Sequence, residues 1–87
     1  MEVYKKRKDY GNGWYINIEE YFICGNPVKA REKHYNPYNQ CVYVKEYTSD
    51  GRVIYEEWRN WWDNGEIKGL YNSEGFKQEF DRRGLPL

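Results

Sequence analysis

The clearest alternation of hydrophobic and polar residues runs from Trp14 to Cys24. One side of this segment carries Trp14, Ile16, Ile18, Glu20, Phe22 and Cys24, with Glu20 as the polar exception. A period of two residues over this length is typical of a half-buried β-strand. The segment therefore predicts a strand, which ends at the turn residues Gly25, Asn26 and Pro27.

Three further segments predict strands. Residues 2–8 begin with hydrophobic side chains and continue into lysines, a pattern typical of an edge strand because charge discourages unwanted pairing. Residues 28–35 are polar and fit a strand that pairs back on the preceding one. Residues 40–48 carry hydrophobic side chains on both sides, which favours a central strand.

Two segments fit either a strand or a helix. In residues 51–63 the run Val53-Ile54-Tyr55 favours a strand, whereas Ile54, Trp58, Trp61 and Trp62 would form one apolar stripe on a helix. We favour the strand because residues 61–68 have the composition of a hairpin. Residues 74–83 alternate as a strand and also fit a short helix that Ser73 would cap, so both structures stay open there.

A second pattern concerns the turns, because an aromatic residue repeatedly precedes a glycine by four positions. The pairs are Tyr21/Gly25, Tyr47/Gly51, Trp61/Gly65, Tyr71/Gly75 and Phe80/Gly84. The residues between them are mostly polar, and glycine supplies the positive φ that tight hairpins need. The pattern indicates one short hairpin unit that is used several times.

Together these signals predict a mainly β fold. We expect a small antiparallel meander of about five to seven short strands, with residues 1–87 as a single domain and residues 47–84 as its hairpin-repeat region. The alternative is an α+β fold with a helix at 51–63. Leu, Ile, Val and Phe total only 16 residues, whereas the chain has ten Tyr and four Trp. We therefore expect an aromatic core, with some aromatic side chains left on the surface.

The hairpin unit also suggests a family. The segments Tyr47–Tyr55, Trp61–Lys68 and Tyr71–Gly75 resemble the MORN-like repeats of bacterial and phage proteins, including the group labelled YwqK-type antitoxin repeat proteins. The resemblance implies a non-catalytic role in contact with another macromolecule. By analogy, it implies a phage or mobile-element inhibitor that blocks a bacterial enzyme or defence complex, as anti-CRISPR or antitoxin proteins do.

Charge and hydropathy narrow the function classes. Fourteen basic and fourteen acidic residues give zero net charge, which argues against broad phosphate binding. The one local excess, Lys5-Lys6-Arg7-Lys8, is interpreted as a solvated strand end or as a nucleic-acid contact. The sequence contains no secretory signal pattern and no apolar window of membrane-spanning length, so we expect a bacterial or host-cell cytoplasmic protein without a membrane partner.

Residues suited to metal binding or catalysis are few. Cys24 and Cys41 are expected to be small buried strand residues, with a disulfide left open if their strands are neighbours. His34 is the only histidine and lies in a charged run, so we interpret it as solvated. The adjacent carboxylates Glu19/Glu20 and Glu56/Glu57 would point to opposite faces of a strand. We therefore expect no metal, no cofactor and no enzyme activity.

What remains is aromatic surface, which predicts a protein-binding module. The candidate contact residues are Trp58, Arg59, Trp61, Trp62, Tyr35 and Tyr38, because Trp, Tyr and Arg dominate interface energetics. The tryptophans could equally form the core of a domain that is poor in leucine. Two other functions stay open. One is single-stranded nucleic-acid binding through stacking and the basic residues Lys5, Lys6, Arg7, Lys8, Arg82 and Arg83. The other is a structural role in which edge strands pair between copies.

Overall fold

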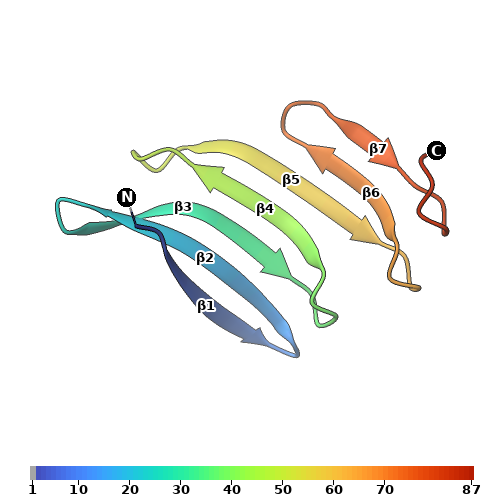
Figure 1. The fold of residues 1–87 in the computed structure, drawn as a ribbon, viewed down its shortest axis with the longest axis horizontal. Helices are drawn as coiled ribbons and strands as arrows, with labels where there is room; N and C mark the ends of the chain where they lie inside the picture. The colour runs from blue at the N-terminus through green and yellow to red at the C-terminus, as the bar shows by residue number, and fades with distance from the viewer. Residues whose placement is uncertain (1) are drawn as a thin grey trace.

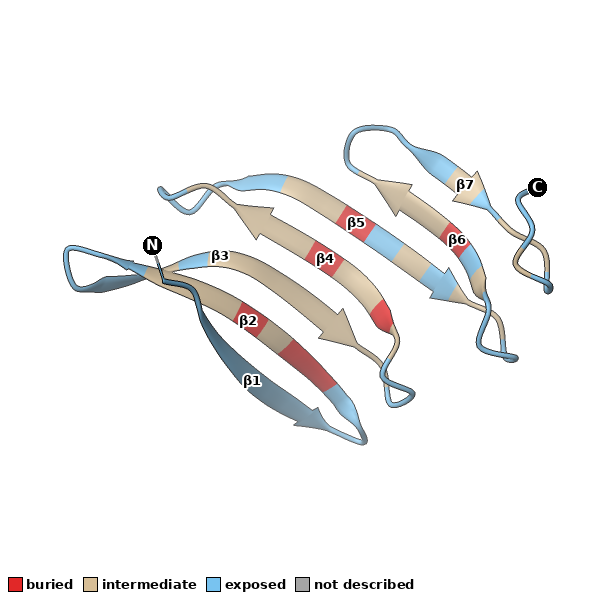
Figure 2. Ribbon diagram, viewed as in Figure 1, coloured by how far each residue is buried: buried red, intermediate tan, exposed pale blue. Residues whose placement is uncertain are grey.

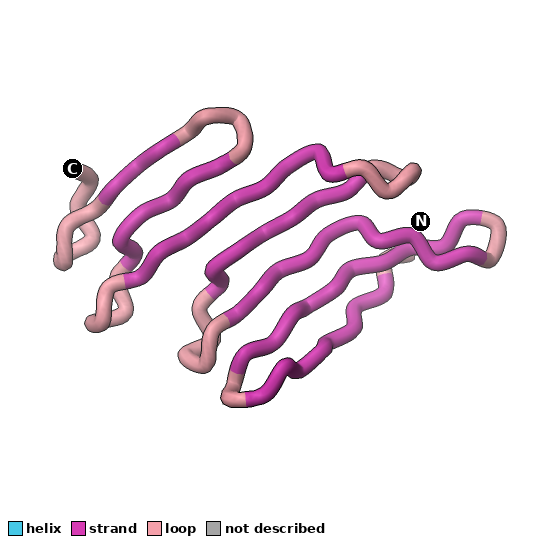
Figure 3. The backbone as a smooth tube through the Cα atoms, turned by 180° about the vertical axis from the view of Figure 1, so that it is seen from behind, coloured by secondary structure: helices cyan, strands magenta, loops and turns pink. Residues whose placement is uncertain are grey.

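The computed structural model describes residues 2–87 as one antiparallel sheet of seven strands, joined in chain order (Figure 1). The strands are β1 (Tyr4–Gly11), β2 (Trp14–Ile23), β3 (Asn26–Tyr35), β4 (Cys41–Tyr47), β5 (Val53–Trp61), β6 (Ile67–Asn72) and β7 (Lys77–Glu79). Figure 3 shows the same backbone from behind, with strands and loops only over the described residues. The prediction of a mainly β meander is confirmed.

Both ambiguous segments are strands. The helix considered for residues 51–63 is wrong, because β5 pairs with β4 on one side and with β6 on the other. The helix considered for residues 74–83 is also wrong, since β7 pairs with β6 there. A helix would need a second layer to cover its apolar stripe. The meander instead satisfies the backbone groups of each segment through its sequence neighbours.

Five loops share one turn, which explains the aromatic–glycine pattern. The turns begin at Asn36, Thr48, Trp62, Asn72 and Asp81. In each, the N–H of the first residue donates to the carbonyl of the fifth, and the N–H of the fourth donates to the carbonyl of the first. The fourth residue has positive φ, and an aromatic residue precedes every turn.

The sequence prediction of these units was right four times and wrong once. Tyr21/Gly25 belongs to a different, two-residue turn in which Cys24 and Gly25 both have positive φ (52° and 80°). The unit that the sequence pattern missed is Tyr35/Asn39, where asparagine takes the place of glycine with φ 61°. Asparagine tolerates this conformation because its short polar side chain can form local hydrogen bonds.

The sheet is a single layer, and this decides how little of it is buried. The radius of gyration is 15.1 Å, against about 12 Å for a compact chain of this length. No described side chain is fully buried, and the buried apolar residues are Tyr15, Ile16, Ile18, Cys41 and Val44 (Figure 2). An aromatic core was expected, but Tyr15 is the only aromatic in this set. All four tryptophans keep some exposure.

Paired residues lie on the same face of a sheet, so the strand registers define two faces. The ladder face carries the cross-strand row Ile16, His34, Tyr43, Trp58 and Tyr71. The groove face carries the row Arg7, Asn17, Lys33, Val44 and Glu57. With both faces open to solvent, aromatic rings, ion pairs and backbone pairing stabilise the sheet in place of a packed interior.

The two cysteines differ. Cys41 is buried in β4 as expected, but Cys24 is exposed in the turn between β2 and β3, so its prediction as a buried strand residue is wrong. Both are free thiols, because β3 separates β2 from β4 in the sheet. The C-terminal residues fold back beside β7, where Leu87 N–H donates to the Glu79 carbonyl at 2.8 Å.

Candidate protein-binding groove

An open groove of about 590 Å³ lies between the β3–β4 turn and the β5–β6 turn. Its walls include Asn36, Tyr38, Gln40, Val42, Arg59, Trp61, Trp62, Asp63, Asn64 and Gly65. We call this surface the aromatic groove. Four of the six contact residues expected from the sequence, Tyr38, Arg59, Trp61 and Trp62, meet here. The two turns come together because β4 starts beside the end of β5 in the antiparallel sheet.

Tyr38 is displayed at the tip of a well-ordered turn. Its side chain is 82% exposed. The Asn36 side-chain oxygen accepts hydrogen bonds from the backbone N–H groups of Tyr38 and Gln40, both at 3.0 Å, and its amide nitrogen donates to Gln40 Oε1 at 2.8 Å. These bonds fix the conformation of the turn. A partner would therefore gain the contact area of Tyr38 at a low cost in backbone entropy.

Trp61 and Trp62 form the aromatic part of the wall. The Trp61 indole N–H donates to the Cys41 carbonyl at 2.9 Å, and the Trp62 indole N–H donates to the Phe80 carbonyl at 3.2 Å. Both rings are half-buried. With each indole N–H satisfied inside the protein, the rings offer mainly apolar surface to the groove.

Trp62 also departs from the pattern of the other turns. In those, the first residue is Asn36, Thr48, Asn72 or Asp81, and its side-chain oxygen accepts a backbone N–H of the turn. Trp62 cannot do this, and its ring lies instead 4.7 Å from Lys68 Nζ and 4.5 Å from the Arg82 guanidinium carbon. The ring thus replaces the side-chain hydrogen bond of the other turns with contacts to two cationic side chains.

Arg59 brings charge to the groove. Its Nε donates to Glu57 Oε2 at 2.5 Å, and Glu57 is the buried charged residue of the sheet. Within residues 2–87, the terminal guanidinium nitrogens of Arg59 have no hydrogen-bond partner. Glu57 therefore positions the side chain, and the outer N–H groups remain able to bind a carbonyl or carboxylate of a ligand.

The remaining two expected contact residues lie elsewhere. Trp58 lies on the ladder face, 41% exposed, with its ring 5.7 Å from that of Tyr43. Tyr35 lies on the groove face and stacks on Tyr15 at 4.9 Å. It lines a second, smaller groove beside β1, together with Lys5, Lys6 and Arg7.

The basic residues expected to contact nucleic acid are not brought together. Lys5 to Lys8 lie on β1 at one edge of the sheet, whereas Arg82 and Arg83 follow β7 at the other. Both arginines are also engaged, Arg82 with Asp63 at 2.5 Å and Arg83 with Asp81 at 3.4 Å. The six residues therefore form no continuous basic surface.

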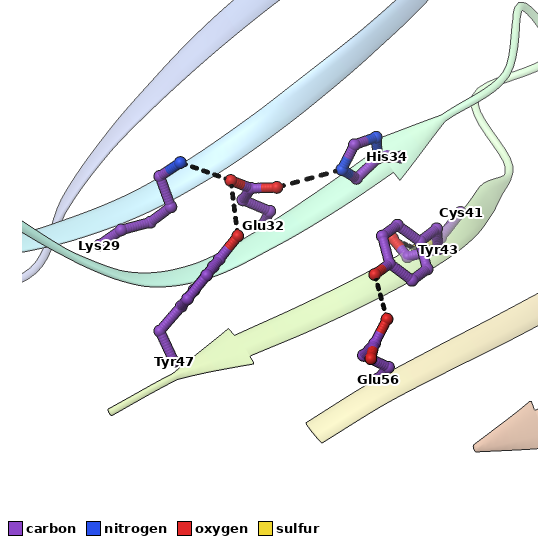
Figure 4. A network of polar contacts seen from close by, with 7 residues as sticks. All are labelled: Lys29, Glu32, His34, Cys41, Tyr43, Tyr47 and Glu56. Atoms are coloured by element: carbon purple, nitrogen blue, oxygen red, sulfur yellow. Dashed lines mark hydrogen bonds and ion pairs between the residues drawn. The ribbon is translucent and has the colours of Figure 1, made fainter. Parts of the chain in front are cut away.

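A polar network on the ladder face was not anticipated from the sequence (Figure 4). The Glu32 carboxylate accepts hydrogen bonds from Lys29 Nζ at 2.6 Å and from the Tyr47 hydroxyl at 3.0 Å, and it lies 3.3 Å from His34 Nε2. His34 was expected to be solvated; its side chain keeps 29% exposure and also contacts Glu32 in this network. The pairing of Glu32 and His34 on one face follows from their spacing, but the approach of Tyr47 depends on the strand register.

Hydrogen bonds and burial shift the pKa of one carboxyl group and two phenols on this face. Burial works against ionisation of Glu32, but hydrogen bonds from Lys29, His34 and Tyr47 lower its pKa overall. Burial and the bond to Glu32 raise the pKa of Tyr47 to about 12. Burial and a hydrogen bond of 2.5 Å to Glu56 raise the pKa of Tyr43. The phenols therefore stay protonated and act as donors that order the carboxylates.

Comparison with protein-family models, curated proteins and solved structures finds no match to this chain. Among residues 2–87, no three His, Cys, Asp or Glu side chains are placed to hold a metal ion. The same residues include no helix long and apolar enough to cross a membrane. The functional conclusion therefore depends on the geometry of the surfaces described above.

Proposed function

We propose that this protein is a non-catalytic binding module that docks on another protein through the aromatic groove. The observation that carries this proposal is the meeting of Tyr38, Trp61, Trp62 and Arg59 around one open groove of about 590 Å³. Interface energy concentrates in such residues when they surround a recess that a partner can fill and keep dry.

The chemistry of the walls favours a protein segment as occupant. The rings offer apolar area, while the amides of Asn36, Gln40 and Asn64 and the outer nitrogens of Arg59 offer hydrogen bonds. This mixture of apolar surface and dispersed hydrogen-bonding groups matches the backbone and side chains of a loop on a partner. If the partner is a bacterial enzyme or defence complex, the 48 × 31 Å sheet would act as an inhibitor by covering its functional surface.

Photo-cross-linking tests the proposal and identifies the partner. Tyr38 is replaced by p-benzoylphenylalanine, and a matched protein carries the same group at Ile54, which is 60% exposed near the other end of β5. Irradiation in a bacterial lysate should give a specific cross-linked protein from position 38 and none from position 54. The same products from both positions would contradict a site at the groove.

The identified partner then allows a quantitative test. Tyr38→Ala should weaken its binding about tenfold, the loss expected of an exposed aromatic anchor. The melting temperature should not change, because the Tyr38 side chain is largely solvent-exposed. Trp58→Ala, an aromatic truncation on the ladder face, is the control. A larger loss from Trp58→Ala than from Tyr38→Ala would move the docking surface to the opposite face.

A further inference from the structure

The two edges of the sheet are built differently. The outer side of β7, a strand of only three residues, is covered by the chain end, through a bridge between Phe80 and Pro86 and the bond from Leu87 N–H to the Glu79 carbonyl. The strand β1 at the opposite edge is eight residues long, exposed throughout, and paired only with β2 (Figure 1). Its outer backbone groups are available to another strand.

The free edge is strongly basic. Lys5, Lys6, Arg7 and Lys8 are consecutive, so cations project on both faces of β1. Lys6 pairs with Glu20 at 3.0 Å and Arg7 with Asp9 at 3.0 Å. Lys5 and Lys8 have no acidic partner within 4.0 Å in the described chain. The first 35 residues hold seven basic and five acidic side chains, whereas the other 52 residues hold seven basic and nine acidic side chains. The positive charge is therefore concentrated in the strands next to this edge.

A basic groove runs beside this edge on the groove face. Its volume is about 290 Å³, and its basic lining residues are Lys5, Lys6, Arg7 and Lys33. Its one carboxylate, Glu19, lies 3.8 Å from Arg31. Lys33, like Lys5, has no acidic partner in the part of the chain described. The groove therefore holds unneutralised positive charge next to an unpaired backbone.

We propose that the β1 edge accepts an extended acidic segment of a partner protein as an additional strand. Main-chain hydrogen bonds to β1 would give affinity, and carboxylates at alternate positions would meet Lys5 and Arg7, which share one face of β1. Lysines on an edge discourage pairing with neutral or basic strands. For an acidic strand the same charges attract, so the edge selects its partner by charge.

A second copy of the chain does not fit this edge. Two β1 strands paired antiparallel about Arg7 would place Arg7 opposite its own copy and Lys6 opposite Lys8, and like charges in direct opposition are destabilising. Pairing of β1 with β7 of another copy is blocked by the C-terminal residues that cover β7. Single-stranded nucleic acid would be attracted by the same positive charge, but it has no peptide groups that could form the main-chain hydrogen bonds of an added strand.

The test uses a fluorescent peptide in which glutamate alternates with threonine and valine, measured by anisotropy with the full-length protein. The peptide should bind wild type, whereas a version N-methylated at alternate residues, with the same charge, should not. Lys5→Glu with Arg7→Glu should weaken binding about tenfold. The control, Lys77→Glu with Arg83→Glu at the other edge, should not. Equal binding of the N-methylated peptide, tighter binding of oligodeoxythymidine or no binding to wild type would overturn the proposal.

Two further measurements keep the result interpretable. If the Lys5/Arg7 variant loses its circular-dichroism spectrum, amide hydrogen exchange of the wild-type protein is measured in its place, and the peptide should slow exchange in β1. Unchanged exchange there would refute strand addition. Tyr38→Ala should bind the peptide as wild type does, because Tyr38 does not line the basic groove. Failure at the β1 edge is thereby distinguished from failure of the aromatic groove.

Discussion

Because the same turn occurs several times, the free-energy cost of a residue other than glycine at its fourth position can be measured at several sites in one molecule. Gly51, Gly65 and Gly75 occupy the fourth position of three such turns, with φ of 89°, 89° and 88°. A Cβ atom added at any of them would meet nothing within 4 Å. Substitution by alanine therefore changes only the backbone preference and removes no contact.

The expected magnitude follows from two opposing effects. A residue with a Cβ costs about 1–2 kcal/mol in the left-handed region. Alanine also restricts the unfolded chain, which returns about 0.4–1 kcal/mol. Each Gly→Ala variant should thus lose about 1 kcal/mol of unfolding free energy, or about 4–8 °C in melting temperature for a domain of this size. Gly→Asn should lose less, because Asn39 adopts positive φ at the same position of the turn that begins at Asn36.

Urea unfolding followed by far-ultraviolet circular dichroism measures these changes. The three alanine variants should agree within about 0.5 kcal/mol, the range over which independent sites behave alike. Gly13→Ala is the contrasting variant, since its new Cβ would lie 2.8 Å from Pro37 Cβ, and it should cost more than any of the three. Three outcomes would contradict this account of the turn: widely different losses of unfolding free energy among the three alanine variants, an asparagine variant no more stable than the alanine variant, or Gly13→Ala as the mildest change.

Three further predictions concern titration and reactivity. The pKa of Glu32 is lowered from its ordinary value of 4.5, so the ionised carboxylate stabilises the fold at pH values above 4.5, and this contribution is lost as the pH falls through the folded pKa. Between pH 6 and pH 3, Glu32→Gln should therefore lose less unfolding free energy than wild type in urea titrations. An equal loss would contradict the network. The pKa of Tyr47 is raised from 10.0 to about 12, so the contribution of the protonated phenol to stability is complete below pH 10 and is lost as the pH rises toward 12. Tyr47→Phe should flatten the alkaline loss of stability, with phenolate absorbance as the readout. Cys24 is exposed and Cys41 is buried, and burial raises the pKa of the Cys41 thiol. A thiol-reactive dye should therefore label one site rapidly in the folded protein, and Cys24→Ser should abolish that rapid phase. Two equal phases would contradict the burial of Cys41.

The residues of the binding surfaces show where sequence reasoning reaches its limit. Alternation along β5 already places Trp61 on the opposite face from Trp58. It cannot bring Tyr38 to Trp61, because the two belong to different hairpins whose turns meet only when β4 and β5 pair. The approach of Tyr47 to Glu32 likewise depends on the register of β3 and β4, which a bulge near Tyr35 shifts. The sequence shows the basic run Lys5-Lys6-Arg7-Lys8, but only the order of the strands in the sheet shows that this run lies on an edge strand with one unpaired side.

The sequence by itself determined the local hairpins of this protein. Turn residues act over four or five positions, and alternation acts within one strand, so both can be recognised without the rest of the chain. Tertiary structure decided whether residues 51–63 form a strand, which rings gather at the aromatic groove, and which edge stays open. These outcomes depend on pairing between segments and on the absence of a second layer among residues 2–87, which leaves both faces of the sheet in contact with solvent.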